Sequence, residues 1–403
     1  MATHTPDSTE PTRLETGTEA VERRIFEAHE GGKLTVEPTA PIDNADDLAI
    51  VYTPGVARVV EEIAEKPEKA REYTIKKNTV AVVTDGSAIL GLGDRGPLAA
   101  LPVMEGKAAL FSRFADVDAF PICLDAHEVE DIVAHVKAIA PAFAGINLED
   151  ISAPRCFEIE DRLRAELDIP VFHDDQHGTA VCVLAALTNA LTIVEKPIEE
   201  VRIAMSGAGA AGTAILRLLL AAGARDVIVA NSKGIVREGR EAGDRLEWIA
   251  RHTNPRGVEG GLREAVAGAD VFIGVSVPNI LDEAMLRSMN ERAIVFALSN
   301  PVPEVDPEIA WKYAAVVATG RSDFANQINN VLAFPGVFRG LIDAHACEVT
   351  DEALLAAAQA IASVVSDEEL SPRHIVPSVF DERVTPAVAR AVARTGEPAR
   401  IEA

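Results

Sequence analysis

Short runs of aliphatic residues alternate along this chain with longer amphipathic stretches, and glycine or proline usually separates them. The run at 79–83 is apolar and mostly β-branched, which is typical of a strand buried in a parallel sheet. Comparable runs predict further strands at 119–124, 169–172, 202–206, 226–230, 271–275, 293–298 and 315–318. Amphipathic or alanine-rich stretches predict helices at 18–32, 56–71, 104–115, 128–141, 178–196, 213–222 and 350–365. Residues 145–154 have the composition of a turn region.

The order of these elements predicts an α/β fold in two parts. Between about 197 and 340 strands alternate with helices, as in a Rossmann-type doubly wound parallel sheet. The strands before it predict a separate N-terminal α/β catalytic domain, since 403 residues are too many for one ordinary core. We expect the N-terminal domain at 1–180, the Rossmann domain at 181–345, and a C-terminal helical segment at 346–403 that packs back on the body.

The composition is strongly acidic. The chain has 63 acidic and 38 basic residues, so the formal net charge is −25. This charge repels nucleic acid and anionic membranes, and we expect neither as a partner. Lysine occurs 10 times and arginine 28 times. An acidic, lysine-poor surface is also what adaptation to high salt favours, because salt screens self-repulsion; the alternative is an ordinary acidic enzyme.

Cysteine usage and hydropathy restrict the compartment. The four cysteines lie far apart and form no C-x-x-C pair, which argues against a zinc–thiolate site or a disulfide scaffold. Residues 1–20 are polar, and no uninterrupted apolar run reaches the ~18–20 residues that a membrane span needs. We therefore expect a soluble, cytoplasmic protein.

Two glycine loops match the pattern G-x-G-x-x-G: Gly91-Leu92-Gly93-Asp94-Arg95-Gly96 and Gly207-Ala208-Gly209-Ala210-Ala211-Gly212. The pattern alone is weak, but only the second loop follows a strand and opens a helix. Its amides can meet a pyrophosphate at the positive end of that helix. We assign the dinucleotide to the second loop. The first is predicted to line the active-site cleft, near the nicotinamide end.

The end of the next strand bears on the choice of cofactor. Asn231 lies 24 residues after Gly207, where a Rossmann unit reads the adenosine ribose. An acidic residue there would repel a 2′-phosphate, whereas Asn231 is neutral and has Ser232, Lys233 and Arg237 close by in the sequence. We predict a preference for NADP over NAD.

Two acidic pairs have side chains suited to a hard divalent ion such as Mg2+ or Mn2+: Glu149-Asp150 and Asp174-Asp175. In so acidic a chain, each pair taken alone is more often a solvated surface feature. The second pair is favoured by its position between a short apolar strand and Gly178-Thr179-Ala180. His173 and His177 beside it are expected to make supporting hydrogen bonds rather than to bind the metal.

Two further side chains are candidates for acid–base work. Lys107 lies among small and apolar residues, and a partly desolvated lysine near a cation has a lowered pKa and can act as a general base. The alternative is a surface lysine with a buried stem. Tyr52 precedes Thr-Pro-Gly, a tight turn that can project it into a cleft, although a core tyrosine with a bonded hydroxyl explains it equally well.

Together these segments resemble the malic enzyme family in its short prokaryotic form. In chain order, the matching segments are Tyr52-Thr53-Pro54-Gly55-Val56, Thr84-Asp85-Gly86 together with the Ile89-Leu90-Gly91-Leu92-Gly93 that follows it, Met104-Glu105-Gly106-Lys107, Leu148-Glu149-Asp150-Ile151, 172–180, 207–212, Ser299-Asn300-Pro301 and 329–336. Eight such segments in family order, between about 50 and 340, make the resemblance specific.

The resemblance implies a role for each matching residue. Tyr52 would be the general acid and Lys107 the general base, with Asp174 in support. The implied metal ligands are Glu149, Asp150 and Asp175. The implied malate-binding residues are Asn300, Asn329 and Asn330, with Asn300 also contacting the cofactor. One position departs from the family: longer members carry an arginine for the substrate carboxylate where this chain has Ala88, so that contact must come from elsewhere.

The implied activity is metal-dependent oxidative decarboxylation of (S)-malate to pyruvate and CO2 by a homodimer or higher homo-oligomer, with decarboxylation of oxaloacetate as a possible second reaction. Lys107 would remove the C2 hydroxyl proton as hydride passes to the nicotinamide, and Tyr52 would protonate C3. Two other classes stay open. An amino-acid dehydrogenase would work without a metal, and a nucleotide-sensing regulatory protein would bind NADP without reducing it.

Overall fold

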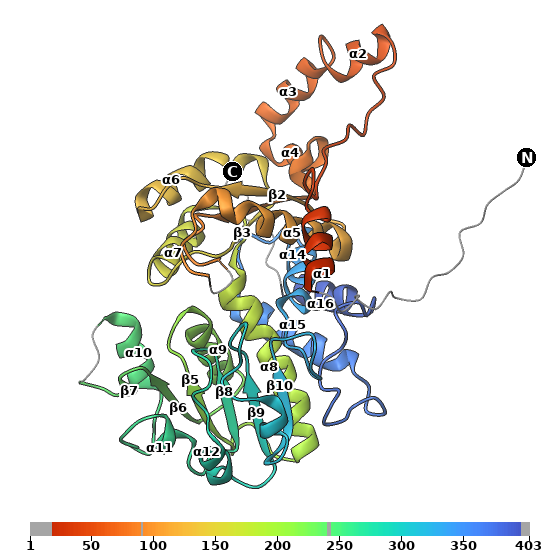
Figure 1. The fold of residues 1–403 in the computed structure, drawn as a ribbon. Coiled ribbons are helices and arrows are strands. Elements are labelled where there is room, and N and C mark those ends of the chain that lie inside the picture. Colours follow the sequence, from red (N-terminus) through yellow and green to blue (C-terminus); the bar gives the residue numbers. More distant parts are fainter. Residues whose placement is uncertain (1–17, 90–91, 240–242, 396–403) are drawn as a thin grey trace, which may run out of the picture.

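The computed structural model describes residues 18–89, 92–239 and 243–395 of the chain (Figure 1). Its smaller sheet has four parallel strands in the order β2-β1-β3-β4. Their bounds are β1 Thr79–Thr84, β2 Asp118–Cys123, β3 Gly145–Leu148 and β4 Val171–His173. Three of these strands were predicted. The prediction of a turn at 145–154 was wrong for β3, which has only four residues and a central asparagine yet is buried throughout.

Helices cover both faces of the small sheet. Their bounds are α5 Pro97–Ala115, α6 Val129–Ile139, the 3-10 turn η4 Ala140–Ala142, and α7 Arg155–Glu166. α5 begins seven residues earlier than the predicted helix at 104–115, with Pro97 at its first turn, where a missing N–H costs nothing. α6 and α7 pack on each other, and their apolar faces form one core with β1, β3 and β4.

The larger sheet has six strands in the order β10-β9-β8-β5-β6-β7, all parallel except for the short edge strand β7. The bounds are β5 Arg202–Ser206, β6 Asp226–Asn231, β7 Gly234–Ile235, β8 Val271–Gly274, β9 Ala293–Ala297 and β10 Ala314–Thr319. Its helices are α9 Ala210–Ala221, α10 Asp244–His252, α11 Leu262–Val266, α12 Glu283–Ser288 and α13 Pro307–Ala310. The predicted Rossmann-type α/β architecture is confirmed. The strand order reverses between β5 and β8, and ligands of such sheets bind at the carboxyl ends of the strands beside that point.

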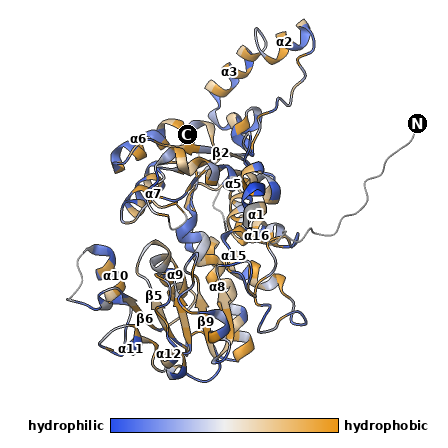
Figure 2. Cartoon of the chain, viewed as in Figure 1, coloured by the Kyte–Doolittle hydropathy of each residue, from blue (hydrophilic) through white to orange (hydrophobic). Residues whose placement is uncertain are grey.

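Helix α8, Asp174–Val194, joins the two sheets and runs through the middle of the molecule (Figures 1 and 2). It begins four residues before the predicted helix at 178–196 and crosses the boundary expected at 180. By length and composition α8 is apolar enough to cross a membrane, although Thr188 and Asn189 keep it from being an uninterrupted apolar run. In the structure 72% of that stretch is buried inside the protein, as in a core helix.

Three C-terminal helices pack on the body: α14 Phe334–Asp343, preceded by the 3-10 turn η5 Asn330–Leu332, then α15 Asp351–Val364 and α16 Val384–Ala393. α15 packs against α8, and α16 lies against both α14 and α15. The helix predicted at 350–365 is confirmed, whereas α16 was not predicted. Close contact explains two glycines of α14, because a Cβ on Gly336 or Gly340 would collide with α16.

The N-terminal region is built differently. Its helices are α1 Thr18–Glu27, α2 Ala45–Val51, α3 Val56–Glu65 and α4 Ala70–Tyr73, with 3-10 turns η1 Pro67–Lys69 and η2 Ile75–Lys77. The predicted helix at 56–71 is interrupted because Pro67 cannot continue α3. We call α2 and α3 together the N-terminal arm, 45–65. Figure 1 shows it projecting from the body, and neither helix has a buried residue.

Candidate active site

The two acidic pairs meet at one edge of the small sheet. Glu149-Asp150 follows β3, and Asp174-Asp175 follows β4 as the first turn of α8. β3 and β4 are parallel neighbours with Leu148 opposite His173, so their carboxyl ends coincide. The backbone N–H of Asp150 donates to Oδ2 of Asp175 at 3.1 Å. The Asp175 carboxylate therefore lies against the backbone of Asp150, 25 residues away in the sequence.

Lys107 points into this cluster from α5. Its Nζ lies 2.6 Å from Oδ2 of Asp174 and 2.9 Å from Oε1 of Glu149, and 4.2 Å from the centre of the Phe334 ring. The side chain is only 10% exposed. Lys107 is therefore a buried amine held by two carboxylates and an aromatic ring, not a snorkelling surface lysine.

The charges of this cluster are strongly coupled. Burial lowers the pKa of Lys107, but the charges of Asp174 and Glu149 outweigh it and raise that pKa above its ordinary value. The expected lowering of the Lys107 pKa presupposes a neighbouring cation and stays a prediction. Burial also raises the pKa of Glu149 well above its usual range, opposed by Lys107 and reinforced by the neighbouring aspartates. Two carboxylates pair with the one ammonium, and the charges of Asp150 and Asp175 also act on Glu149, so the cluster has an excess of negative charge that a divalent cation would relieve.

The donor set fits Mg2+ or Mn2+ in chemistry, because these ions prefer carboxylate oxygens. Glu149, Asp150 and Asp174 are buried, and Oδ1 of Asp174 has no hydrogen-bond partner among the described residues. Among all the residues that the structure describes, however, no group of three His, Cys, Asp or Glu side chains is already placed to hold a metal ion. Glu149 faces Lys107 instead, so the predicted ligand set remains a prediction.

The two histidines beside the acidic pair behave differently. Nε2 of His177 lies 2.7 Å from Oε1 of Glu160, and Gln176 donates to Oε2 of the same carboxylate at 2.9 Å. A supporting hydrogen bond was expected for both histidines. It is found for His177, whereas neither ring nitrogen of the buried His173 has a hydrogen-bond partner among the described residues, and its Nδ1 lies 3.9 Å from Oδ2 of Asp175. Glu160, on α7, is a buried carboxylate that anchors the start of α8, and the sequence reasoning missed it.

The asparagine loop before α14 reaches the same cluster. Asn330 Nδ2 donates to Oδ2 of Asp174 at 3.0 Å, and its Oδ1 accepts from the Thr179 hydroxyl at 3.0 Å. Asn329 instead turns back on its own loop, where its Oδ1 accepts from the N–H of Val331. The structure thus brings Asn330, but not the Asn329 amide, to the Lys107–Asp174 pair.

The loop of Ala88 packs on the acidic cluster through its backbone. The N–H of Ala88 donates to the carbonyl of Asp150 at 3.0 Å. The structure brings Arg155 to this loop, but its guanidinium pairs with the buried Asp85 at 2.8 Å and also bonds Ser152. Arg155 is therefore a support of the loop, and it does not stand in for the missing arginine. The first glycine loop includes residues 90–91, so its predicted role falls partly outside the described residues.

The second glycine loop has the backbone shape that a dinucleotide needs. Gly207 has φ +115°, and a Cβ there would lie 2.6 Å from the Val275 carbonyl. A Cβ on Gly212 would lie 2.1 Å from the Gly207 carbonyl, whereas one on Gly209 would meet nothing within 4 Å. The loop is therefore closely packed at Gly207 and Gly212 and open at Gly209. α9 begins at Ala210, three residues before the predicted helix, and no side chain caps its first amides. Those amides can receive a phosphate.

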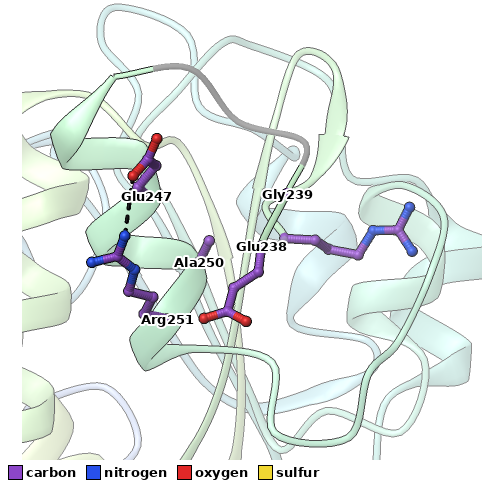
Figure 3. Close-up of a pocket in the computed structure, with 6 residues that line it drawn as sticks. Glu238, Gly239, Glu247, Ala250 and Arg251 are labelled. Carbon is purple, nitrogen blue, oxygen red and sulfur yellow. Dashed lines mark hydrogen bonds and ion pairs between the residues drawn. The ribbon is translucent and has the colours of Figure 1, made fainter.

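The residues expected to bind the adenosine ribose do not decide between NADP and NAD. Asn231 ends β6, and its Oδ1 accepts from the N–H of Lys233 at 2.8 Å. A nearby hollow of about 380 Å³ is lined by Arg237, Glu238, Gly239, Glu247, Ala250 and Arg251 (Figure 3). Both arginines are already paired, Arg237 with Glu259 and Arg251 with Glu247. The hollow therefore gives no independent support to the predicted preference for NADP.

Besides Asn329, two more residues predicted for the catalytic or malate site stay outside the cluster. Asn300 is exposed in the loop after β9, at the edge of the larger sheet. Tyr52 is 66% exposed and follows α2 on the N-terminal arm, which projects away from the body (Figure 1). Within this one chain, Tyr52 is not brought to Lys107. Phe334, whose ring lies against the Lys107 ammonium, belongs to the matching segment 329–336, but the resemblance implied no role for it.

Comparisons with known proteins cover nearly the whole chain. The family profile of the malic enzyme N-terminal domain matches residues 31–164, and that of the malic enzyme NAD binding domain matches residues 176–396. The NAD-dependent malic enzyme of Geobacillus stearothermophilus is 58% identical over 382 residues, which are 93% of this chain and 80% of that protein. The bifunctional malic/malolactic enzyme of Bacillus subtilis is 52% identical over 90% of this chain and 89% of its own length.

Solved structures agree with this relationship. The malic enzyme from Pyrococcus horikoshii has a TM-score of 0.90 and 49% identity, and the match covers 93% of this chain and 90% of that one. The NAD-dependent malic enzyme from Thermotoga maritima has a TM-score of 0.88 and 48% identity, over 94% of this chain and 99% of that one.

Proposed function

The chain belongs to the malic enzyme family, and on that premise we propose that it converts (S)-malate to pyruvate and CO2 while reducing NADP or NAD. One observation carries the proposal. A buried amine, Lys107, lies within hydrogen-bonding distance of Asp174 and Glu149, beside Asp150 and Asp175. This combination of a base with carboxylates for a hard cation suits the removal of a hydroxyl proton next to a carboxylate.

The chain's own residues supply the proton transfers. A divalent cation on the neighbouring carboxylates would offset the negative charge that raises the pKa of Lys107, so that its amine could take the C2 hydroxyl proton. Asp174, hydrogen-bonded to both Lys107 and Asn330, holds that amine in place. Asn330 and Asn300 bind the malate through their amides. When bound, the nicotinamide supplies a hydride acceptor, and the divalent cation supplies electrophilic stabilisation of the developing negative charge. Glu149, Asp150 and Asp175 would hold that cation.

The proposed general acid, Tyr52, does not lie beside Lys107 of its own chain. Tyr52 lies on an arm whose apolar side chains are open to solvent, namely Leu48, Ile50, Val51, Val59 and Val60. Such a surface calls for a partner. We propose that the partner is a second copy of this chain, and that the arm of each copy brings its Tyr52 to the Lys107 of the other. The site would then be complete only in the expected homo-oligomer.

A complementation experiment tests the exchanged arm. Tyr52→Phe and Lys107→Ala are each expected to be inactive as pure proteins. When the two variants are unfolded and refolded together, mixed dimers would contain one site with both wild-type residues, and activity should return. Mixed dimers that form but remain inactive would mean that Tyr52 and Lys107 serve a site within one chain.

The finer assignments follow from the same reasoning. We propose NADP as the preferred cofactor because Asn231 is neutral, Mg2+ or Mn2+ as the metal because the donors are carboxylates, and a cytoplasmic, salt-adapted enzyme because of the −25 net charge. Decarboxylation of oxaloacetate would use the same cation and Lys107. No nucleic acid or membrane enters the proposal.

The activity itself is tested by following the absorbance band of reduced nicotinamide with malate, NADP or NAD, and with Mg2+ or EDTA. We expect reduction with malate and Mg2+, faster with NADP, and loss of the signal in EDTA. Reduction that needs an amino acid and persists in EDTA would instead indicate an amino-acid dehydrogenase.

A further inference from the structure

Glu304 is a buried carboxylate at the edge of the Rossmann-type sheet where the cofactor is expected. It lies in the segment that follows the loop of Asn300, and its exposed fraction is 0%. Neither the sequence motifs nor the proposed mechanism gives it a role. A buried carboxylate is costly unless its oxygens are bonded, so its contacts indicate what it does.

Both oxygens of Glu304 accept hydrogen bonds from backbone N–H groups. The N–H of Ser276 donates to Oε1 at 2.9 Å, and the N–H of Ser299 donates to Oε2 at 3.0 Å. Ser276 follows β8 and Ser299 follows β9, so one side chain ties the loops of two neighbouring strands. The Ser276 hydroxyl also lies 2.8 Å from that of Ser206, the last residue before Gly207.

The position of the carboxylate is fixed from both sides. The carbonyls of Pro303 and Glu304 accept from the N–H groups of Asn279 and Leu281, which anchors the backbone of this segment. A Cβ on Gly274, the last residue of β8, would lie only 2.5 Å from Cδ of Glu304. β8 therefore has to end in glycine for the carboxylate to pass. Burial raises the pKa of Glu304, and the backbone donors oppose that rise only in part.

The two loops held by Glu304 border the place where the strand order reverses. That reversal lies between β5 and β8, and a dinucleotide runs across such a crevice from the glycine loop toward the loops of the next strands. Ser299 directly precedes Asn300, the residue expected to contact both the cofactor and malate. The hydrogen bond from the Ser299 N–H to Glu304 therefore fixes the backbone next to Asn300.

We propose that Glu304 is a positioning residue, which holds the Ser276 and Ser299 loops, and with them Asn300, against the nicotinamide half of the cofactor. The inference rests on the proposed function. It assigns to Glu304 no contact with substrate: the carboxylate acts through the two loops.

The test is Glu304→Gln. Glutamine keeps one acceptor oxygen but turns an NH2 group toward the other backbone N–H, so one loop is released. A displacement of about 1 Å at a reacting group costs roughly 100-fold in rate. We therefore expect kcat/KM for malate to fall roughly 10- to 100-fold and NADP to bind more weakly. Binding of 2′-phospho-ADP-ribose, which lacks nicotinamide, should stay close to that of the wild type.

Two further variants make the result specific. Gly274→Ala leaves the carboxylate intact but pushes on it, and should reproduce the same separation between NADP and 2′-phospho-ADP-ribose binding. Glu308→Gln, an exposed glutamate four residues later, is the matched control and should behave like the wild type.

Unchanged kinetics in Glu304→Gln would overturn the proposal. So would an equal loss of affinity for both ligands together with a lower melting temperature, which would indicate a purely structural role. Failure of the proposed function is a separate result. If the wild type reduced no NADP with malate, the comparison of the two binding affinities would still test what Glu304 holds.

Discussion

A single methyl group at Gly178 should disable the site without unfolding the protein. Gly178 lies one helical turn after Asp174 on α8, and a Cβ there would be 2.0 Å from Oδ1 of Asp174. Contacts under 3.0 Å are essentially never tolerated by a real Cβ, so in Gly178→Ala the carboxylate has to move by about 1 Å (3.0 − 2.0). That movement breaks its 2.6 Å bond to Lys107 and its 3.0 Å bond to Asn330.

The magnitude follows from this displacement. Misplacing a catalytic group by about 1 Å costs roughly 100-fold, or about 2.7 kcal/mol of transition-state stabilisation. Stability should fall as well, but not enough to unfold the protein. The two lost hydrogen bonds to the carboxylate cost about 1.5–3 kcal/mol each, and replacing glycine by alanine inside a helix returns about 1 kcal/mol. Gly178→Ala should therefore lose activity while keeping a cooperative unfolding transition.

The assay is kcat/KM for malate at saturating cofactor, with thermal unfolding measured in parallel. Gly106→Ala is the matched control. It is also a helical glycine beside the site, on α5, but its Cβ would meet only Nζ of Lys33 at an ordinary 3.6 Å. The control should retain activity close to that of the wild type. Wild-type activity in Gly178→Ala would refute the reasoning, because Asp174 would then not need its place beside Lys107.

Three further outcomes are expected. Lys107→Ala should abolish turnover while NADP binding, followed by fluorescence titration, persists; activity within about tenfold of the parent would remove Lys107 from the mechanism. Mg2+ at 100 times its Kd should stabilise the wild type by about 2.7 kcal/mol, because it relieves repulsion among Glu149, Asp150, Asp174 and Asp175. That gain should disappear in Asp175→Asn, and an equal gain in both proteins would place the bound ion elsewhere. Thermal unfolding in dilute buffer should occur at a lower temperature than in concentrated KCl, since salt screens the net charge of −25; full stability without salt would contradict the proposed salt adaptation.

The long periodic segments were predictable because burial on both sides of a parallel sheet leaves a strong hydrophobic signal. β1, β5 and β6 were identified in this way. β3 was missed because Gly145–Leu148 is short and contains Asn147, whose side chain is buried but bonded to Glu149. The pattern shows which side chains are apolar, and it cannot show which polar ones will find a partner.

The candidate site was likewise predictable only in part. Lys107, Asp174 and Asn330 come together from α5, α8 and the loop before α14, as the ordered motifs indicated. The rise in the Lys107 pKa could not be predicted, because it depends on the distances to Glu149 and Asp174. Tyr52 was identified by its motif, but no local pattern says that a helix pair will project from the body. Glu304 has no motif at all, and only the hydrogen bonds of its loops reveal it.

The most direct measurement is anomalous diffraction at the manganese edge, from crystals of the enzyme grown with Mn2+ and malate. The account predicts one manganese ion at coordination distance from oxygens of Glu149, Asp150 and Asp175, with Lys107 beside the malate C2 hydroxyl. A manganese ion bound elsewhere, or a malate that avoids Lys107, would contradict it.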